Sequence, residues 1–126
     1  MAKSKTVFVV DDSASLRERL VAVLSAVDGL EVVGEAQNAR EAVSAIHNLR
    51  PEVVILDIQM PDGTGIGVLR EMKGDYPSTV VIMLTNHAEA QYQKRCLELK
   101  ADYSLSKSTD WKQLLVRNFR SAETQK

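Results

Sequence analysis

The stretch VFVVDDSAS, from Val7 to Ser15, decides the fold and raises the first question about function. Thr6–Val10 is short and almost entirely apolar, which is the pattern of a strand buried on both faces of a sheet. Asp11 and Asp12 follow it directly, although adjacent like charges repel each other, and more strongly where they are partly buried. A bound cation, a helix N-terminus or exposure to water would each offset that repulsion.

Strand and helix patterns alternate along the chain outward from this stretch. Apolar residues at helical spacing predict helices within 16–27, 42–49 and 66–72, and two more around 92–99 and 111–119. Ser15 and Glu18 are predicted to cap the first helix, and the second is predicted to stop before Pro51. Four further strands are predicted at Leu30–Ala36, Val53–Leu56, Thr79–Leu84 and Tyr103–Ser106.

Such repeated strand–helix units predict an α/β fold, a doubly wound sheet of five parallel strands covered by five helices. The 126 residues suit a single domain, with its core at about 5–122. The net charge of -1 argues against direct nucleic-acid binding. Cys96 is the only cysteine, and the apolar run before Asp11 is too short for a signal peptide or a membrane span. We therefore expect a cytoplasmic protein without membrane insertion.

Polar groups follow the predicted strands where each one ends. They are Asp11 and Asp12 after the first strand, Asp57 after the third, Thr85 after the fourth and Lys107 after the fifth. In parallel α/β sheets, ligands bind at the carboxyl ends of the strands. Each of these residues, taken alone, is as well explained as a cap, a turn residue or a solvated side chain. Their coincidence at four strand ends favours a common site.

The chemistry of that set suits phosphoryl transfer. Carboxylate oxygens with open positions beside them are the ligands that Mg2+ takes in proteins. A carboxylate can also act as a nucleophile and form an aspartyl phosphate, and we choose Asp57 for this role because it lies between the other groups. Lys107 would bind a phosphate oxygen as a point charge, and Thr85 would donate a hydrogen bond to another.

At this point the sequence resembles a response regulator receiver domain of the chemotaxis-regulator type. The resemblance covers about 5–122, through VFVVDDSASLRERL, PEVVILDIQMPDGTGIGVL, VVIMLTNHAEA and ADYSLSKS. It implies the flavodoxin-like strand order 2-1-3-4-5. It also implies that Asp57 is the phosphorylated residue, that Asp12, Asp57 and the Gln59 carbonyl bind Mg2+, and that Asp11 acts through a metal-bound water.

The same resemblance implies a two-component signalling role. The phosphoryl group would come from a histidine kinase or phosphotransfer protein, and Thr85 and Tyr103 would form a switch that changes partner binding. Arg17 and Arg19 would offer a docking face for the phosphoryl donor. We expect no output domain after the last helix and no conventional enzyme, only self-catalysed phosphorylation and dephosphorylation. The downstream target and pathway are left open.

Several positions depart from the family pattern. Ser108 stands where a proline usually follows the lysine, which predicts either a trans Lys107–Ser108 bond with a re-aimed loop or a strained cis bond. Asn86 replaces a small residue, and Gln59 and His87 occupy positions that tune the lifetime of the phosphoryl group. These departures affect lifetime and switching, and they remove no chemical group from the site.

Two other functions compete with this interpretation. The first is a phosphohydrolase with an aspartate nucleophile, although such enzymes place an Asp-x-Asp pattern after the first strand, where this chain has adjacent aspartates. The second is an interaction domain that never accepts phosphate. Receivers of that kind usually lose the acids or the lysine, whereas this chain keeps them.

Overall fold

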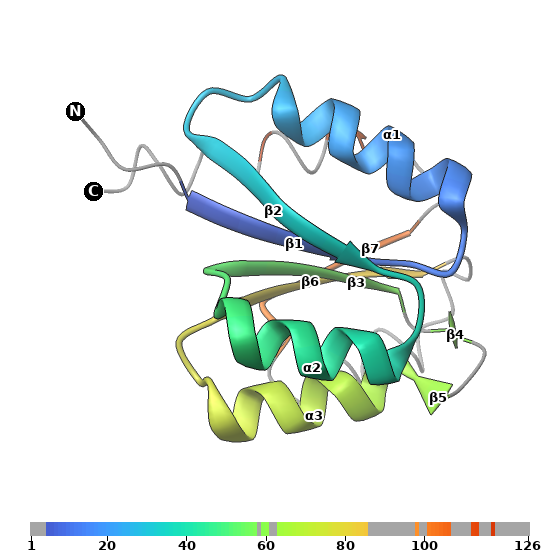
Figure 1. Ribbon diagram of the computed structural model, residues 1–126, viewed down its shortest axis with the longest axis vertical. Coiled ribbons are helices and arrows are strands. Elements are labelled where there is room, and N and C mark those ends of the chain that lie inside the picture. Colours follow the sequence, from blue (N-terminus) through green and yellow to red (C-terminus); the bar gives the residue numbers. More distant parts are fainter. Residues whose placement is uncertain are drawn as a thin grey trace.

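The strands form one parallel sheet with helices on both of its faces. A computed structural model describes residues 5–57, 59–60, 63–85, 98, 101–106, 112–113 and 117. The main sheet has the order β2-β1-β3-β6-β7, and every neighbouring pair is parallel. Helix α1 covers one face, while α2 and α3 lie side by side on the other (Figure 1). The elements are β1 Lys5–Val10, α1 Ala14–Ser25, β2 Leu30–Ala36, α2 Ala39–Leu49, β3 Val53–Asp57, β4 Gln59–Met60, β5 Gly63–Thr64, α3 Gly65–Asp75, β6 Val80–Thr85 and β7 Tyr103–Ser106.

The predicted parallel α/β sheet is confirmed, with its first four long strands in the expected order and β7 beside β6. Three of the predicted helices are present as α1, α2 and α3. The two predicted around 92–99 and 111–119 lie almost wholly outside the described residues, so the full count of five helices stays a prediction. Within the described part of the chain, no helix combines the length and the apolar character needed to cross a bilayer.

The sheet separates two hydrophobic cores. Phe8 and Val10 of β1 pack with residues of α2 and α3, whereas Val7 and Val9 pack with Leu20 and other residues on the α1 side. This alternation follows from the pleat, which sends successive side chains to opposite faces. Strand β3 is buried along its whole length, as its apolar run predicts for a central parallel strand.

A register shift in the β1–β2 pair coincides with a glycine. Val7 pairs with Val32 and Phe8 pairs with Gly34, so Val33 is an extra residue in β2. A Cβ atom at Gly34 would lie 2.9 Å from Cε1 of the buried Phe8 ring. Glycine is therefore required here because the ring approaches the β2 backbone more closely than a side chain allows.

Helix α1 begins earlier than the sequence pattern indicated. Its N-cap is Ser13, whose Oγ accepts a hydrogen bond from the Leu16 backbone N–H at 3.2 Å. The predicted capping box at Ser15 and Glu18 is therefore wrong, because both residues already lie inside the helix. Two serines two positions apart offer the same capping chemistry, and the motif alone does not choose between them.

Helix α2 is capped at both ends by residues next to it in the sequence. Asn38 Oδ1 accepts from the Glu41 N–H at 2.8 Å, and the helix ends at Leu49. Arg50 follows in the left-handed conformation, with a φ of 47°, directly before Pro51. The predicted stop before Pro51 is confirmed, because a residue that precedes proline is disfavoured in the helical conformation.

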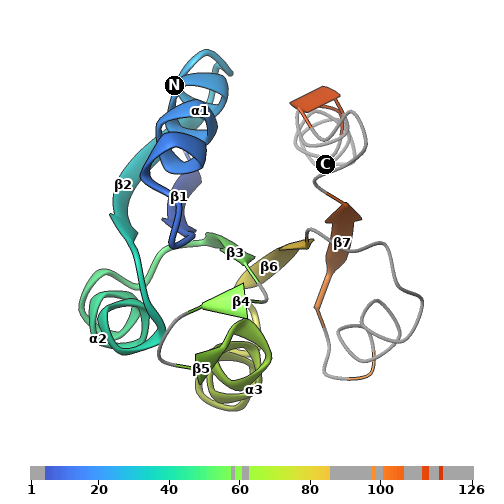
Figure 2. The ribbon, with the colours of Figure 1, turned by 90° about the vertical axis from the view of Figure 1, so that its right-hand side faces the viewer.

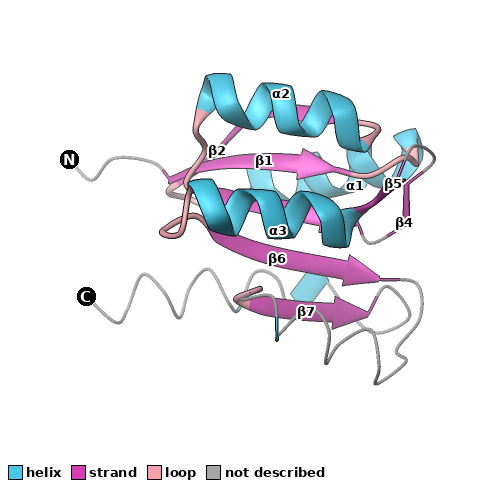
Figure 3. Ribbon diagram, turned by 90° about the horizontal axis from the view of Figure 1, so that it is seen from below, coloured by secondary structure: helices cyan, strands magenta, loops and turns pink. Residues whose placement is uncertain are grey.

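The stretch QMPDGTG, predicted as a loop, contains a small antiparallel pair of strands. Gln59 pairs with Thr64 and Met60 with Gly63. Two residues per strand are too few to show the period-2 pattern by which strands are predicted. The pair, β4 and β5, lies beyond the carboxyl ends of the main strands (Figures 2 and 3).

Asp102 fixes the start of β7, which is the last strand of the sheet. Its Oδ2 accepts from the Val81 N–H at 2.8 Å and from Lys73 Nζ at 2.9 Å, and its own N–H donates to the Val81 carbonyl at 2.9 Å. Lys73 Nζ also donates to the Thr79 carbonyl. This network joins α3 to β7, the strand that begins with the predicted switch residue Tyr103 and precedes Lys107 in the sequence.

Candidate functional site

Adjacent strands bring the predicted acidic residues together. The β1–β3 register pairs Val10 with Leu56, so the residues that follow, Asp11 and Asp57, are neighbours at the carboxyl edge of the sheet. Asp57 closes β3 and pairs with Leu84 of β6. The sequence-based expectation that the first and third strands lie side by side is therefore confirmed.

Three carboxylates meet at this edge. One carboxylate oxygen from each of Asp11, Asp12 and Asp57 lies within 4.8 Å of the others. Asp11 is 1% exposed and Asp57 is 3% exposed, whereas Asp12 is exposed to solvent. Asp11 and Asp57 are the two charged residues that are buried in the described part of the chain. Burying carboxylates this close together is unfavourable unless hydrogen bonds or a cation stabilise the charges.

The side chain and the backbone N–H of Asp11 both form hydrogen bonds that hold the turn after β1. Its Oδ1 accepts from the Ser13 N–H at 2.9 Å, and its own N–H donates to the Ala36 carbonyl at 3.1 Å. The same Ser13 then caps α1, so helix start and acidic turn are built from consecutive residues. This arrangement orients Asp11 toward the cluster before any ligand binds.

Arg17 braces the same turn from α1, a role that the sequence did not reveal. Its Nη1 donates to the Asp11 backbone carbonyl at 2.7 Å, and its Nε donates to Glu35 Oε1 at 2.9 Å. The Arg17 side chain is only 15% exposed. Arg17 is therefore engaged within the domain, whereas Arg19 is exposed on α1, and the docking face for the phosphoryl donor stays a prediction.

The cluster suits a small divalent cation. Mg2+ takes oxygen ligands at about 2.0–2.1 Å, so two oxygens on opposite sides of one ion lie about 4.2 Å apart. Because one oxygen from each carboxylate lies within 4.8 Å of the other two, the cluster is compact enough to surround one such ion. Exposure of Asp12 leaves the site open to solvent, as an ion that retains several waters requires.

The β6–β7 register separates the two predicted switch residues. Thr85 ends β6 and pairs with Ser106, whereas Tyr103 pairs with Ile82. Ile82 belongs to the core on the α1 side, and Thr85 has the strand parity of Met83, which belongs to the core on the α2 side. The two strand positions therefore differ in parity, and the predicted Thr85–Tyr103 switch stays a prediction.

Other predicted site residues are only partly located. Gln59 begins β4, two positions after Asp57. Lys107, together with the predictions for Asn86, His87 and the Lys107–Ser108 bond, lies outside the described residues. Their assigned roles stay predictions.

Comparison with known proteins agrees with this geometry. A family model described as "Response regulator receiver domain" matches residues 7–118. The chain is 37% identical over 110 residues to the protein-glutamate methylesterase/protein-glutamine glutaminase 1 of Carboxydothermus hydrogenoformans, covering 86% of this chain and 32% of that protein. It is 32% identical over 108 residues to the response regulator protein VraR of Staphylococcus aureus, covering 86% of this chain and 52% of that protein.

A solved structure shows the same fold. A chain of the CheX-CheY-BeF3-Mg2+ complex from Borrelia burgdorferi aligns with a TM-score of 0.87 and 26% identity, covering 95% of this chain and 90% of that one. The present chain spans about a third to a half of the curated relatives that it matches. With the acidic cluster at the carboxyl edge of a parallel sheet and a family model matching most of its length, the chain belongs to the response regulator receiver domains.

Proposed function

We propose that this chain is the phospho-acceptor of a two-component system, and that Asp57 takes the phosphoryl group from a phosphohistidine of a histidine kinase or phosphotransfer protein. One observation carries the proposal. The buried Asp57 carboxylate closes the central strand and lies within 4.8 Å of the carboxylate oxygens of Asp11 and Asp12. Family membership supports the signalling role.

The proposed transfer exchanges one bond for another. A carboxylate oxygen of Asp57 attacks phosphorus, the phosphorus–nitrogen bond of the donor histidine breaks, and its electron pair stays on the imidazole, which takes a proton from water. The product is an aspartyl phosphate. Attack by water on phosphorus later returns the Asp57 carboxylate and inorganic phosphate.

The residues around Asp57 would neutralise the transferred oxygens. Carboxylates of Asp12 and Asp57, the Gln59 carbonyl, and Asp11 through a water would hold Mg2+, which supplies positive charge where the phosphoryl group is transferred. Lys107 would bind another phosphoryl oxygen. The complex from Borrelia burgdorferi, which shares this fold, contains Mg2+ and BeF3.

Phosphorylation would then change partner binding at the β6–β7 edge of the sheet. Thr85 is the proposed first contact, because it ends the strand beside Asp57. Tyr103 is not proposed to make this first contact, because it pairs with Ile82, three positions before Thr85 on β6. The proposal describes an acceptor that phosphorylates and dephosphorylates itself, without turnover of an organic phosphate substrate.

Intact-mass measurement tests the proposal directly. The protein is incubated with acetyl phosphate, with and without Mg2+, and then with a phosphorylated histidine kinase. We expect one labile phosphoryl adduct that requires Mg2+ and is lost in Asp57→Ala. Asp28→Asn, which changes an exposed acid in the turn before β2, is the matched control and should behave as the parent.

Two results would overturn the proposal. One is the absence of an adduct with both donors, and the other is an adduct that persists in Asp57→Ala. Rapid hydrolysis of an organic phosphate, lost in Asp11→Asn but retained in Asp57→Asn, would indicate the phosphohydrolase instead.

A further inference from the structure

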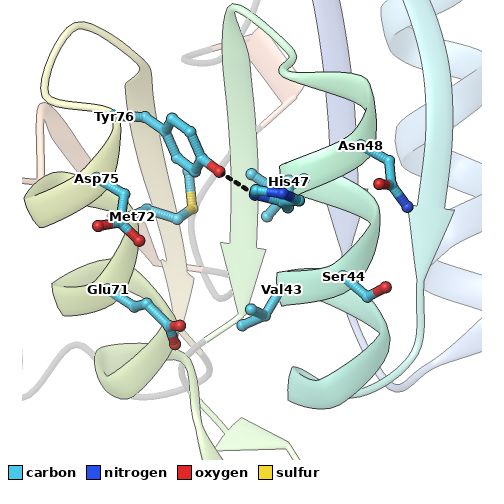
Figure 4. A pocket seen from close by; sticks show the side chains of 9 residues that line it. Val43, Ser44, His47, Asn48, Glu71, Met72, Asp75 and Tyr76 are labelled. Carbon is cyan, nitrogen blue, oxygen red and sulfur yellow. Dashed lines mark hydrogen bonds between the residues drawn. The ribbon is translucent and has the colours of Figure 1, made fainter.

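A pocket of about 240 Å3 opens between α2 and α3, well away from the acidic cluster. Its floor is apolar, formed by Ile46 and Met72, which are each 2% exposed, with the half-buried Val43 beside them. Figure 4 shows Glu71 extending from α3 toward Val43 of α2 across the gap. The pocket is therefore apolar at its base and acidic at its rim.

One end of the pocket is closed by a polar bridge. His47 Nδ1 and the Tyr76 hydroxyl lie 2.7 Å apart, and this hydrogen bond spans from α2 to the residue after α3 (Figure 4). The guanidinium carbon of Arg50 lies 5.2 Å from the centre of the Tyr76 ring. These contacts fix the aromatic wall, so the pocket exists before any partner arrives.

The rim carries negative charge that the described residues do not neutralise. Glu71 and Asp75 lie one helical turn apart on α3, and both are exposed. Among the described residues, the ion pairs are Arg17–Glu35 and Lys73–Asp102, and neither involves these two carboxylates. Of the neighbouring cations, Lys73 pairs with Asp102, Arg50 lies over the Tyr76 ring, and Arg70 is exposed beside Glu71 without an ion pair to it among the described residues.

Helix direction adds to this negative potential. The pocket is lined by the last two turns of α2 and α3. The carboxyl end of a helix carries partial negative charge, which favours a cation nearby. Because crossover helices run antiparallel to the strands, these helix ends lie at the opposite edge of the sheet from Asp57 (Figure 3).

Size and chemistry together select the ligand. The volume is below the 300–1,000 Å3 typical of small-molecule sites, which favours a single side chain of a partner over a whole small molecule. An apolar floor under an acidic rim fits a side chain with an aliphatic stem and a cationic head. Arginine fits better than lysine because its planar guanidinium binds carboxylates in a bidentate manner and is less strongly hydrated.

We propose that the α2–α3 pocket is a docking site for an arginine side chain of a partner protein. The methylene stem packs on Val43 and Met72, and the guanidinium binds Glu71, with Asp75 adding attraction. The site does not depend on Asp57 chemistry, so it serves a partner that stays bound in both phosphorylation states.

Methyl-detected NMR titration tests the proposal with three defined probes. These are the Nα-acetyl methylamides of arginine, of citrulline (which has the same shape without the charge) and of leucine. We expect saturable shifts of the Val43, Ile46 and Met72 methyl groups with the arginine probe. Binding should weaken about fivefold with citrulline, which is the factor for about 1 kcal/mol of a partly exposed ion pair at 1.36 kcal/mol per tenfold.

Variants of Glu71 and Asp75 test whether the acidic rim is responsible for binding of the arginine probe. Glu71→Gln should weaken arginine binding toward the level of citrulline, and Glu71→Gln with Asp75→Asn should bring it to that level. Glu31→Gln, an exposed acid on β2, is the matched control and should leave binding unchanged, as should Asp57→Ala.

Four outcomes would overturn the proposal. They are no saturable shift of the pocket methyl groups, equal binding of arginine and citrulline, tighter binding of the leucine probe, and equal binding in Glu71→Gln. Shifts of the same methyl groups by anionic phospholipid vesicles, with none from the arginine probe, would assign the surface to a membrane instead.

Discussion

Arg17→Met tests whether the acidic turn is braced from α1. The substitution removes a charge-assisted hydrogen bond of 2.7 Å to the Asp11 carbonyl, and such bonds contribute about 1.5–3 kcal/mol. The ion pair with Glu35, which is 47% exposed, adds at most about 1 kcal/mol. Methionine preserves most of the packing of the aliphatic stem. We therefore expect the free energy of unfolding to fall by about 2 kcal/mol, measured by urea denaturation.

Two companion variants separate the contribution of the Arg17–Asp11 hydrogen bond from that of the ion pair with Glu35. Arg19→Met is the matched control, because Arg19 is exposed on the same helix, and it should change stability by less than about 0.5 kcal/mol. Glu35→Gln keeps the Arg17–Asp11 bond and removes only the ion pair, so it should cost less than about 1 kcal/mol. Equal losses in Arg17→Met and Arg19→Met would refute the assigned brace.

Three further predictions concern the sheet and its contact with α3. Gly34→Ala should lower the free energy of unfolding by about 1–2 kcal/mol, because its methyl group would meet the Phe8 ring at 2.9 Å; an unchanged urea midpoint would contradict this. Asp102→Asn should cost about 1–2 kcal/mol by leaving Lys73 without its ion pair, and adding Lys73→Met should cost less than the two single losses summed. Tyr103→Ala should leave the rate of phosphorylation by acetyl phosphate within about twofold of the parent, and a tenfold loss would restore Tyr103 to the site.

Much of the architecture followed from the sequence because apolar patterning acts over whole elements. The buried run before Asp57 is typical of a central parallel strand, and polar residues that follow such strands meet at one edge of the sheet. Signals that depend on one or two residues, such as helix caps, determined less of the structure. Ser13 and Ser15 are equally good caps by type, and the hydrogen-bond geometry to Leu16 selects Ser13.

Tertiary contacts were beyond the sequence pattern for a physical reason. Arg17 meets the Asp11 carbonyl and Glu35 only because α1 packs across β1 and β2, and nothing in its neighbours along the chain signals that bond. The close approach of Phe8 to Gly34 likewise depends on a register shift between strands. The α2–α3 pocket arises from helices brought together by the sheet, so its lining residues are dispersed in sequence.

Strand ends and strand parity carry different information, and the site needs both. Ending a strand places Asp57, Thr85 and, by prediction, Lys107 at one edge of the sheet. Parity then divides that edge, because Asp57 follows Val53 and Ile55 on the α1 side, whereas Thr85 follows Val81 and Met83 on the α2 side. The proposed contact of a phosphoryl group on Asp57 with Thr85 would therefore link the two faces at the carboxyl edge of the sheet. Since the pocket between α2 and α3 lies at the far ends of those helices, the proposed phosphoryl acceptor and the proposed arginine site would occupy opposite edges of the sheet.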